Sequence, residues 1–200
     1  MTVIAASLPV VATSAGVVAL AEIGDKTMLL AVLLAARYRQ PAAVLAGILV
    51  ATLANHGLAA WAGAALAGLL AGPLFQLAVA IGFLAMAVWT LVPDAMEEAP
   101  RLVNRAQAFT ATGIAFFVVE IGDKTQVATV ALGARFHDIL AVTIGTTAGM
   151  MLANGPAVLV GERALALVPL AHVRRLAALL FAGLGLWLLW SLWPVIAGTG

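Results

Sequence analysis

The chain has 200 residues, of which 64% are hydrophobic and 10% are charged, and its mean hydropathy is +1.12. Soluble domains carry about 25% charged residues, so this composition excludes a water-soluble globular protein and indicates an integral membrane protein. The net charge of +1 comes without a basic patch, so no nucleic-acid partner is expected, and the lack of cysteine excludes disulfides, thiol nucleophiles and cysteine-based metal sites.

The N-terminal segment, residues 1–16, lacks the lysine or arginine that opens a secretory signal. Residues 5–7, Ala-Ala-Ser, resemble a cleavage site. Without a basic start, however, we expect the first apolar run to be retained as a transmembrane helix.

Six apolar segments follow one another along the chain, separated by charged or proline-containing breaks. They are residues 9–36, 42–64, 73–92, 108–134, 139–160 and 174–197. Each reaches the length of about 20 residues that a hydrocarbon core of about 30 Å requires. Every backbone amide in lipid needs an internal partner, and no period-2 alternation is present, so helices are expected. The sequence predicts an all-α integral membrane protein with six transmembrane helices.

A charged hexapeptide, EIGDKT, occurs at residues 22–27 and again at 120–125, 98 positions later (120 − 22). The same offset relates Arg37 to Arg135, Gly47 to Gly145 and Trp89 to Trp187. This duplication predicts two three-helix repeats, 1–92 and 108–200, joined by a link at 93–107. Because each repeat has an odd number of helices, the second must enter the membrane from the opposite side. The result is an inverted repeat, as in many secondary transporters.

Basic residues are unevenly divided between the two predicted sides of the membrane. The links after the first, third and fifth helices hold Arg37, Arg39, Arg101, Arg105, Arg163, Arg174 and Arg175, and the opposite side holds only Arg135. The positive-inside rule therefore places these links, including 93–107, in the cytoplasm and both termini outside it. With no targeting extension in the sequence, we expect a bacterial inner membrane.

The repeated hexapeptide places acidic side chains inside apolar segments. Glu22 and Asp25 are spaced i, i+3, as are Glu120 and Asp123, so we expect each pair to lie on one face of its helix. An ionised side chain at mid-membrane costs about 2.5–3.5 kcal/mol on insertion scales. If the repeats bring these four carboxylates into one small volume, they must hold protons or bind a cation.

Oxygen donors surround these acids in the sequence. Asn55 and Asn154 end the same triplet, Leu-Ala-Asn, in the two halves. Carboxylate and amide oxygens suit Mn²⁺, Ca²⁺ or Mg²⁺, whereas copper and zinc prefer His or Cys. The predicted metal ligands are Glu22, Asp25, Glu120, Asp123, Asn55 and Asn154, with supporting roles for Lys26, Thr27, Lys124, Thr125 and Gln126. The metal is a transported substrate in this hypothesis, and no cofactor is expected.

Glycine and lysine complete the hexapeptide. Gly24 and Gly122 lack side chains, which predicts close approach of a neighbouring helix. Lys26 and Lys124 each follow the Glu of their own motif by four residues, the spacing of an intrahelical ion pair. A purely structural cluster of four acids and two lysines would keep a surplus of two negative charges, which favours a bound cation.

The two E-x-G-D-[KR]-[TS] motifs resemble those of the cation transporter family once catalogued as uncharacterised protein family 0016. The matching residues are Glu22, Gly24, Asp25, Lys26, Thr27, Glu120, Gly122, Asp123, Lys124 and Thr125. The resemblance covers nearly the whole chain. It implies transport of Mn²⁺ and Ca²⁺ in exchange for protons and, in bacteria, chiefly Mn²⁺ export.

Other function classes account for less of the pattern. An intramembrane aspartyl protease needs two acids sharing a proton, as Asp25 and Asp123 could, but not the adjacent Glu and Lys or an inverted duplication. An exporter of a small solute such as a basic amino acid needs amino- and carboxylate-recognition groups, and a cation channel does not require lysines in its site. We therefore expect a transporter and not an enzyme, whose partners are divalent cations, protons and the lipid bilayer.

Two weaker signals remain open. His56 could lend a nitrogen to a metal, although a lone membrane histidine is as often a hydrogen-bonding contact between helices. Small residues such as Gly63 and Ala67 indicate close helix packing and are compatible with a homodimer.

Overall fold

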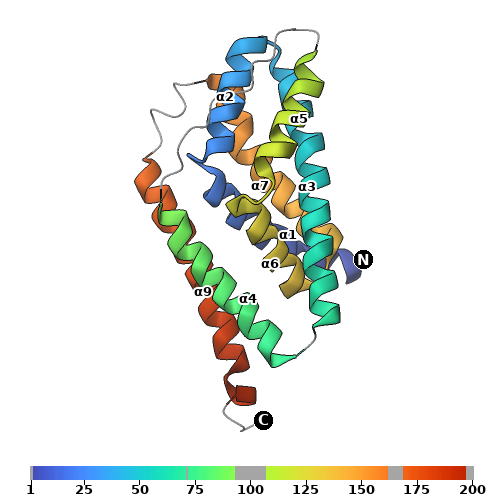
Figure 1. Ribbon diagram of the computed structural model, residues 1–200, viewed down its shortest axis with the longest axis vertical. Helices are drawn as coiled ribbons and strands as arrows, with labels where there is room; N and C mark the ends of the chain where they lie inside the picture. The colour runs from blue at the N-terminus through green and yellow to red at the C-terminus, as the bar shows by residue number, and fades with distance from the viewer. Residues whose placement is uncertain (1, 71, 93–106, 162–168, 197–200) are drawn as a thin grey trace.

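The computed structural model describes residues 2–70, 72–92, 107–161 and 169–196. Within these ranges every regular element is a helix (Figure 1). The helices are α1 (Thr2–Glu22), α2 (Lys26–Tyr38), α3 (Pro41–Leu69), α4 (Pro73–Leu91), α5 (Ala108–Glu120), α6 (Lys124–Phe136), α7 (Ile139–Val160) and α9 (Leu170–Ile196). The predicted link at 93–107 lies outside the described residues apart from Gln107, and so do Arg101, Arg105 and Arg163.

The helices predicted at 9–36 and 108–134 are not continuous. α1 ends at Glu22 and α2 begins at Lys26, while α5 ends at Glu120 and α6 begins at Lys124. Gly24 and Gly122 lie at these breaks with φ of +81° and +77°, a left-handed conformation that interrupts a right-handed helix. The prediction that each Glu shares one helical face with its Asp is therefore wrong, because the break separates them.

In the part of the chain that the structure describes, four helices are long and apolar enough to cross a bilayer: α3, α4, α7 and the Leu170–Trp193 part of α9. The Ser7–Glu22 part of α1 and the whole of α5 are apolar but shorter. The first and fourth predicted spans are thus each built from two helices in series, α1 with α2 and α5 with α6.

Helices from the two halves of the chain are interleaved. α3 packs against α5 and α6, α7 packs against α1 and α2, and α3 and α7 also contact each other. α4 and α9 lie side by side along one edge of the molecule (Figure 1). Each broken helix pair is therefore in contact with a long helix from the other half.

The contact between α4 and α9 joins residues at equivalent positions of the two halves. Phe83 and Phe181, which are 98 positions apart (181 − 83), are fully buried and stack with their ring centroids 6.4 Å apart. They belong to a hydrophobic cluster that also includes Met86 and Leu132. A residue that meets its own equivalent is the pattern expected at a two-fold axis.

Two close helix crossings form a matched pair. A Cβ added at Gly47 of α3 would lie 2.6 Å from the carbonyl oxygen of Phe109, and one added at Gly145 of α7 would lie 2.5 Å from that of Val11. Both glycines and both carbonyls are related by the offset of 98 positions. Backbone contact at these crossings leaves no room for a side chain.

Gly63 was one of the small residues whose predicted close packing is compatible with a homodimer, but in the structure it packs against another helix of the same chain. A Cβ at this position would collide with the carbonyl oxygen of Val130 in α6. Ala67, the other such residue, is also buried within the chain. These two residues therefore provide no exposed surface for a second copy.

We expect Gly47→Ala to destabilise the protein by about 1–3 kcal/mol, the usual cost of overpacking a close contact. The added methyl group meets a main-chain carbonyl that cannot rotate away. Gly68→Ala in the same helix is the matched control, because nothing lies within 4 Å of that position. Thermal unfolding in detergent measures the difference, and equal melting temperatures for the two variants would contradict the close crossing.

Candidate functional site

The four acids of the repeated hexapeptide lie buried at the two helix breaks. Glu22 and Glu120 are the last residues of α1 and α5 and have no exposed surface, while Asp25 and Asp123 are 4% and 3% exposed. Each Asp occupies the N-cap position of the helix that follows, but neither side chain accepts a capping hydrogen bond. The carboxylates are therefore directed at other partners.

Ion pairs cross from one hexapeptide to the other. Nζ of Lys26 lies 3.2 Å from Oδ1 of Asp123, and Nζ of Lys124 lies 3.7 Å from Oδ1 of Asp25. The predicted intrahelical pairing of each Lys with the Glu of its own motif is not the arrangement found, because the break carries the Lys into a new helix. Each lysine instead faces the aspartate of the other half.

The two crossed pairs differ in their exposure to the surroundings. The Lys124 side chain is 3% exposed, donates to the carbonyl oxygen of Val92 at 3.2 Å and lies 6.0 Å from the ring centroid of Trp89. The Lys26 side chain is 23% exposed. The Asp25–Lys124 pair is thus enclosed by protein, and the Asp123–Lys26 pair lies closer to the surface.

Glu120 is held by two side chains of α3. Asn55 Nδ2 donates to its Oε2 and Thr52 Oγ1 donates to its Oε1, both at 3.2 Å. Asn55 also donates to the carbonyl oxygen of Phe117 at 2.9 Å. The structure therefore brings Asn55 to the second hexapeptide, where its amide orients a buried carboxylate.

Asn154 makes different contacts in the other half. Its Nδ2 donates to the carbonyl oxygen of Met150 at 3.1 Å and lies 2.8 Å from the Met150 sulfur. Gln126 also has a local role, since its Oε1 accepts a hydrogen bond of 2.6 Å from the backbone N–H of Gly122. Gln126 therefore supports the turn at the second helix break.

Several buried oxygen atoms around the breaks have no hydrogen-bond partner in the described part of the chain. They are Oγ1 of Thr27, Oγ1 of Thr125, Oδ1 of Asn154 and Oδ2 of Asp25. Buried polar atoms in proteins are nearly always partnered. All four atoms are hard oxygen donors of the kind that Mn²⁺ and Ca²⁺ accept.

The side chains are not gathered as a ready-made metal site. Within the described ranges, no group of three or more His, Cys, Asp or Glu side chains is placed to hold a metal ion. His56 is fully buried on α3, and neither of its ring nitrogens has a hydrogen-bond partner among the described residues. The aspartates are held in lysine-paired form, with each pair spanning the two halves.

Some residues at the site escaped the sequence analysis. Thr52 lies one helical turn before Asn55, so the i, i+3 spacing on one face of α3 was a usable signal. Thr90 and Arg174 line a cavity of about 10 Å³ together with Asp25 and Lys124. Nothing in their local sequence indicated this, because their helices reach the site only through the tertiary fold.

Comparison with known proteins identifies the family of this chain. The sequence model of the family described as divalent cation/proton antiporter GDT1 matches residues 10–98 and 108–195, once in each half of the chain. The chain belongs to this family. It is a multi-pass membrane protein that transports divalent cations, and the metal ion is its substrate rather than its cofactor.

A curated relative from Vibrio cholerae serotype O1 (strain ATCC 39541 / Classical Ogawa 395 / O395) is named "Putative manganese exporter". It is 49% identical over 175 residues, which cover 87% of this chain and 87% of the relative. No solved structure was found to match the chain. The family match extends over both hexapeptides.

Proposed function

We propose that this member of the family exports Mn²⁺ from the cytoplasm in exchange for protons. The observation that carries the proposal is the pair of crossed ion pairs, in which a lysine of each half neutralises a buried aspartate of the other. The name of the Vibrio cholerae relative supports Mn²⁺ as the exported ion. Ca²⁺ is the second candidate, because the oxygen donors suit both ions.

In this proposal the chain crosses the membrane six times, in two inverted repeats at 1–92 and 108–200. α1 with α2, and α5 with α6, each form one discontinuous span, the element that builds substrate sites in many secondary transporters. The stacking of Phe83 on Phe181 and the reciprocal pairing of the two hexapeptides support a two-fold relation between the halves.

The orientation in the proposal follows the basic residues. Arg37, Arg39, Arg174 and Arg175 lie at the ends of helices on the side assigned to the cytoplasm, and Arg135 lies on the other side. Both termini are then outside the cytoplasm. The membrane in this proposal is a bacterial inner membrane.

The lysines act as tethered cations when no metal is bound. Four carboxylates and two lysines leave a surplus of two negative charges, which protons or one divalent cation neutralise. Metal binding moves the ammonium groups of Lys26 and Lys124 away and draws oxygen atoms from both halves onto one ion. The proposed ligands are Glu22, Asp25, Glu120, Asp123, Asn55 and Asn154, with the hydroxyl groups of Thr27 and Thr125 in support.

Transport follows from alternate exposure of this shared site. The two halves rock against each other, metal enters from the cytoplasm and displaces protons, and protons return from outside as the metal leaves. Because metal and protons compete for the same carboxylates, a state that holds both is disfavoured. This competition couples the two fluxes.

The test is uptake of Mn²⁺ and of Ca²⁺ into proteoliposomes with an imposed pH gradient, comparing wild type with Glu22→Gln and Glu120→Gln. We expect gradient-driven Mn²⁺ uptake by the wild type and its loss in both variants, because an amide can neither hold a proton nor neutralise a cation. An ionophore that collapses the gradient and protein-free vesicles are the controls. Uptake that is indifferent to both substitutions would contradict the site, and no uptake of either ion would contradict the exchange.

A further inference from the structure

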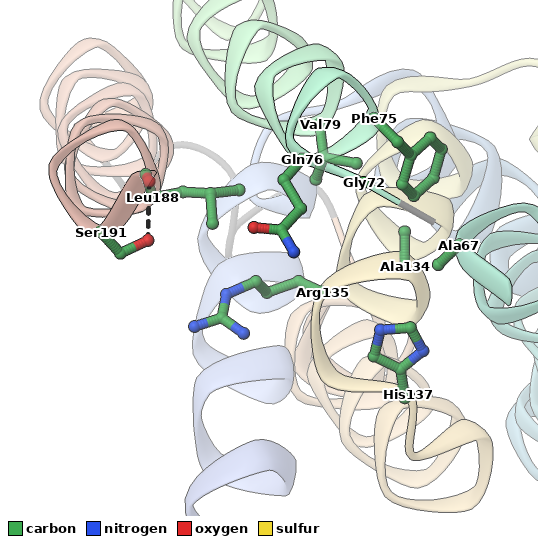
Figure 2. Close-up of a pocket in the computed structure, with 10 residues that line it drawn as sticks. All are labelled: Ala67, Gly72, Phe75, Gln76, Val79, Ala134, Arg135, His137, Leu188 and Ser191. Carbon is green, nitrogen blue, oxygen red and sulfur yellow. Dashed lines mark hydrogen bonds between the residues drawn. The ribbon is translucent and has the colours of Figure 1, made fainter. Parts of the chain in front are cut away.

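A second polar cavity lies away from the hexapeptides, where α4 begins and where α6 and α9 approach their C-terminal ends (Figure 2). Its volume is about 270 Å³. The polar residues that line it are Gln76 of α4, Arg135 at the end of α6, His137 just beyond it and Ser191 of α9. Figure 2 shows the Gln76 amide and the Arg135 guanidinium directed into the same space. Nothing in the transport mechanism uses this cavity.

Arg135 is the charged group of the cavity, and it is held in place without a carboxylate. Its guanidinium lies 4.5 Å from the ring centroid of Trp187 and 5.9 Å from that of Phe136. Its Nε is buried and has no hydrogen-bond partner in the described ranges. The nearby carboxylate of Asp138 is occupied, since it accepts hydrogen bonds from Ser7 and from the backbone N–H of Ala141. A guanidinium that lines a cavity whose other lining residues include no carboxylate is suited to an oxyanion.

An apolar pocket adjoins the polar cavity. Its volume is about 540 Å³, and it shares Gly72 and Phe75 with the polar cavity. The rest of its lining consists of Leu70, Pro73, Leu74 and Ala78. On α9, Trp190 and Trp193 are 81% and 66% exposed close to Ser191, as expected for aromatic residues at a membrane–water interface. A cationic cavity beside an apolar pocket at this level matches a headgroup followed by an acyl chain.

We propose that this cavity binds the phosphate group of an anionic membrane phospholipid. Arg135 and the Gln76 amide N–H donate to the phosphate oxygens, and an acyl chain lies along the apolar pocket at Phe75. The Ser191 hydroxyl lines the cavity but donates to the carbonyl oxygen of Leu188 at 2.7 Å. In the proposed orientation this cavity lies on the side away from the cytoplasm, where the charge of Arg135 attracts the phosphate of a lipid and the apolar pocket accommodates its acyl chain. The shared chemistry is a phosphate monoanion, and the apolar pocket favours a lipid over free phosphate as its source.

The repeat supplies a matched control for this proposal. Arg37 is the equivalent of Arg135, 98 positions earlier (135 − 37), at the end of α2. Its side chain is exposed, and it lines none of the cavities described here. Arg37→Gln and Arg135→Gln change the net charge equally. A difference in lipid retention between the two variants therefore indicates a binding site at Arg135.

Lipid retention by the purified protein is the measurement, made by native mass spectrometry after incubation with phosphatidylglycerol, phosphatidylcholine or inorganic phosphate. We expect wild type and Arg37→Gln to retain phosphatidylglycerol in preference to phosphatidylcholine. Arg135→Gln should weaken that retention about tenfold, as the loss of one charge-assisted contact typically does. Arg135→Lys should restore part of it, since the charge is kept but the planar donor set is lost.

Two results would overturn the proposal. Equal phosphatidylglycerol retention by Arg37→Gln and Arg135→Gln would show that the cavity holds no headgroup. Stabilisation by inorganic phosphate without lipid retention would exclude a phospholipid as the source. If Arg135→Gln does not fold, Gln76→Leu tests the same cavity from α4. The outcome is independent of the transported ion, because retention is measured without a metal gradient.

Discussion

We expect Asp25→Asn and Asp123→Asn each to abolish cation transport while leaving membrane insertion intact. Each aspartate faces the lysine of the other half, and asparagine keeps the size of the side chain while removing its charge. The variants can neither neutralise a divalent cation nor carry a proton at that position. Loss of a charged partner in a buried site costs enough binding free energy for a fall of at least about a hundredfold, so any residual initial rate should lie at or below that level.

The measurement is the initial rate of Mn²⁺ uptake into proteoliposomes under a pH gradient. Asp138→Asn is the matched control, because Asp138 lies outside the hexapeptides and asparagine can still cap α7 in its place. Normal gel-filtration profiles of all three variants would show that the protein folds. Wild-type uptake by Asp25→Asn or Asp123→Asn would remove that aspartate from the proposed site.

The second large effect concerns stability. Lys124→Gln leaves the Asp25 carboxylate enclosed without its counter-ion, and breaking a buried ion pair costs about 3–5 kcal/mol. Lys26→Gln should cost less, because the Lys26 side chain is 23% exposed, whereas Lys124→Gln also loses the contacts with the carbonyl oxygen of Val92 and the ring of Trp89. Thermal unfolding in detergent measures both variants, and we expect the melting temperature of Lys124→Gln to fall further.

A double variant separates the ion pair from simple packing. Adding Asp25→Asn to Lys124→Gln should recover part of the lost stability, because no uncompensated charge is then left in the interior. Mn²⁺ should raise the melting temperature of Lys124→Gln more than that of the wild type, since a cation can replace the missing ammonium. Equal losses for Lys26→Gln and Lys124→Gln would contradict the difference in burial between the two pairs.

The hexapeptide shows where sequence reasoning succeeded and where it failed. Its four acids and two lysines were recognised from their repetition in apolar surroundings, and the structure places all four acids in the interior. The role of Gly122 was misjudged, whereas the close approach predicted at Gly24 is found, because Leu170 of α9 lies against it. A glycine that allows a close helix crossing and a glycine that adopts a positive φ look the same in a sequence, and both residues adopt a positive φ here. A Cβ at Gly122 would meet nothing within 4 Å, whereas one at Gly24 would meet Leu170 of α9.

The same ambiguity affected Gly47 and Gly145. They served only as landmarks of the duplication, whereas in the structure they mark two matched close crossings, α3 on α5 and α7 on α1. A small residue in a transmembrane segment can allow close packing against any of several neighbouring helices. Which carbonyl lies opposite each glycine depends on how the halves interleave.

The sequence by itself determined the membrane environment, the duplication and the chemical nature of the site. Composition, hydropathy and a repeated charged motif can be recognised in the sequence without knowing which segments pack against one another. Only the tertiary structure decided that the two motif-bearing spans are broken and that Lys26 pairs with Asp123 and Lys124 with Asp25. These partners are almost half the chain apart, and each lysine has a Glu at helical spacing in its own motif. Which acid each lysine pairs with depends on the backbone turn at the glycines and on the packing of one half against the other. Neither can be predicted from a local sequence pattern.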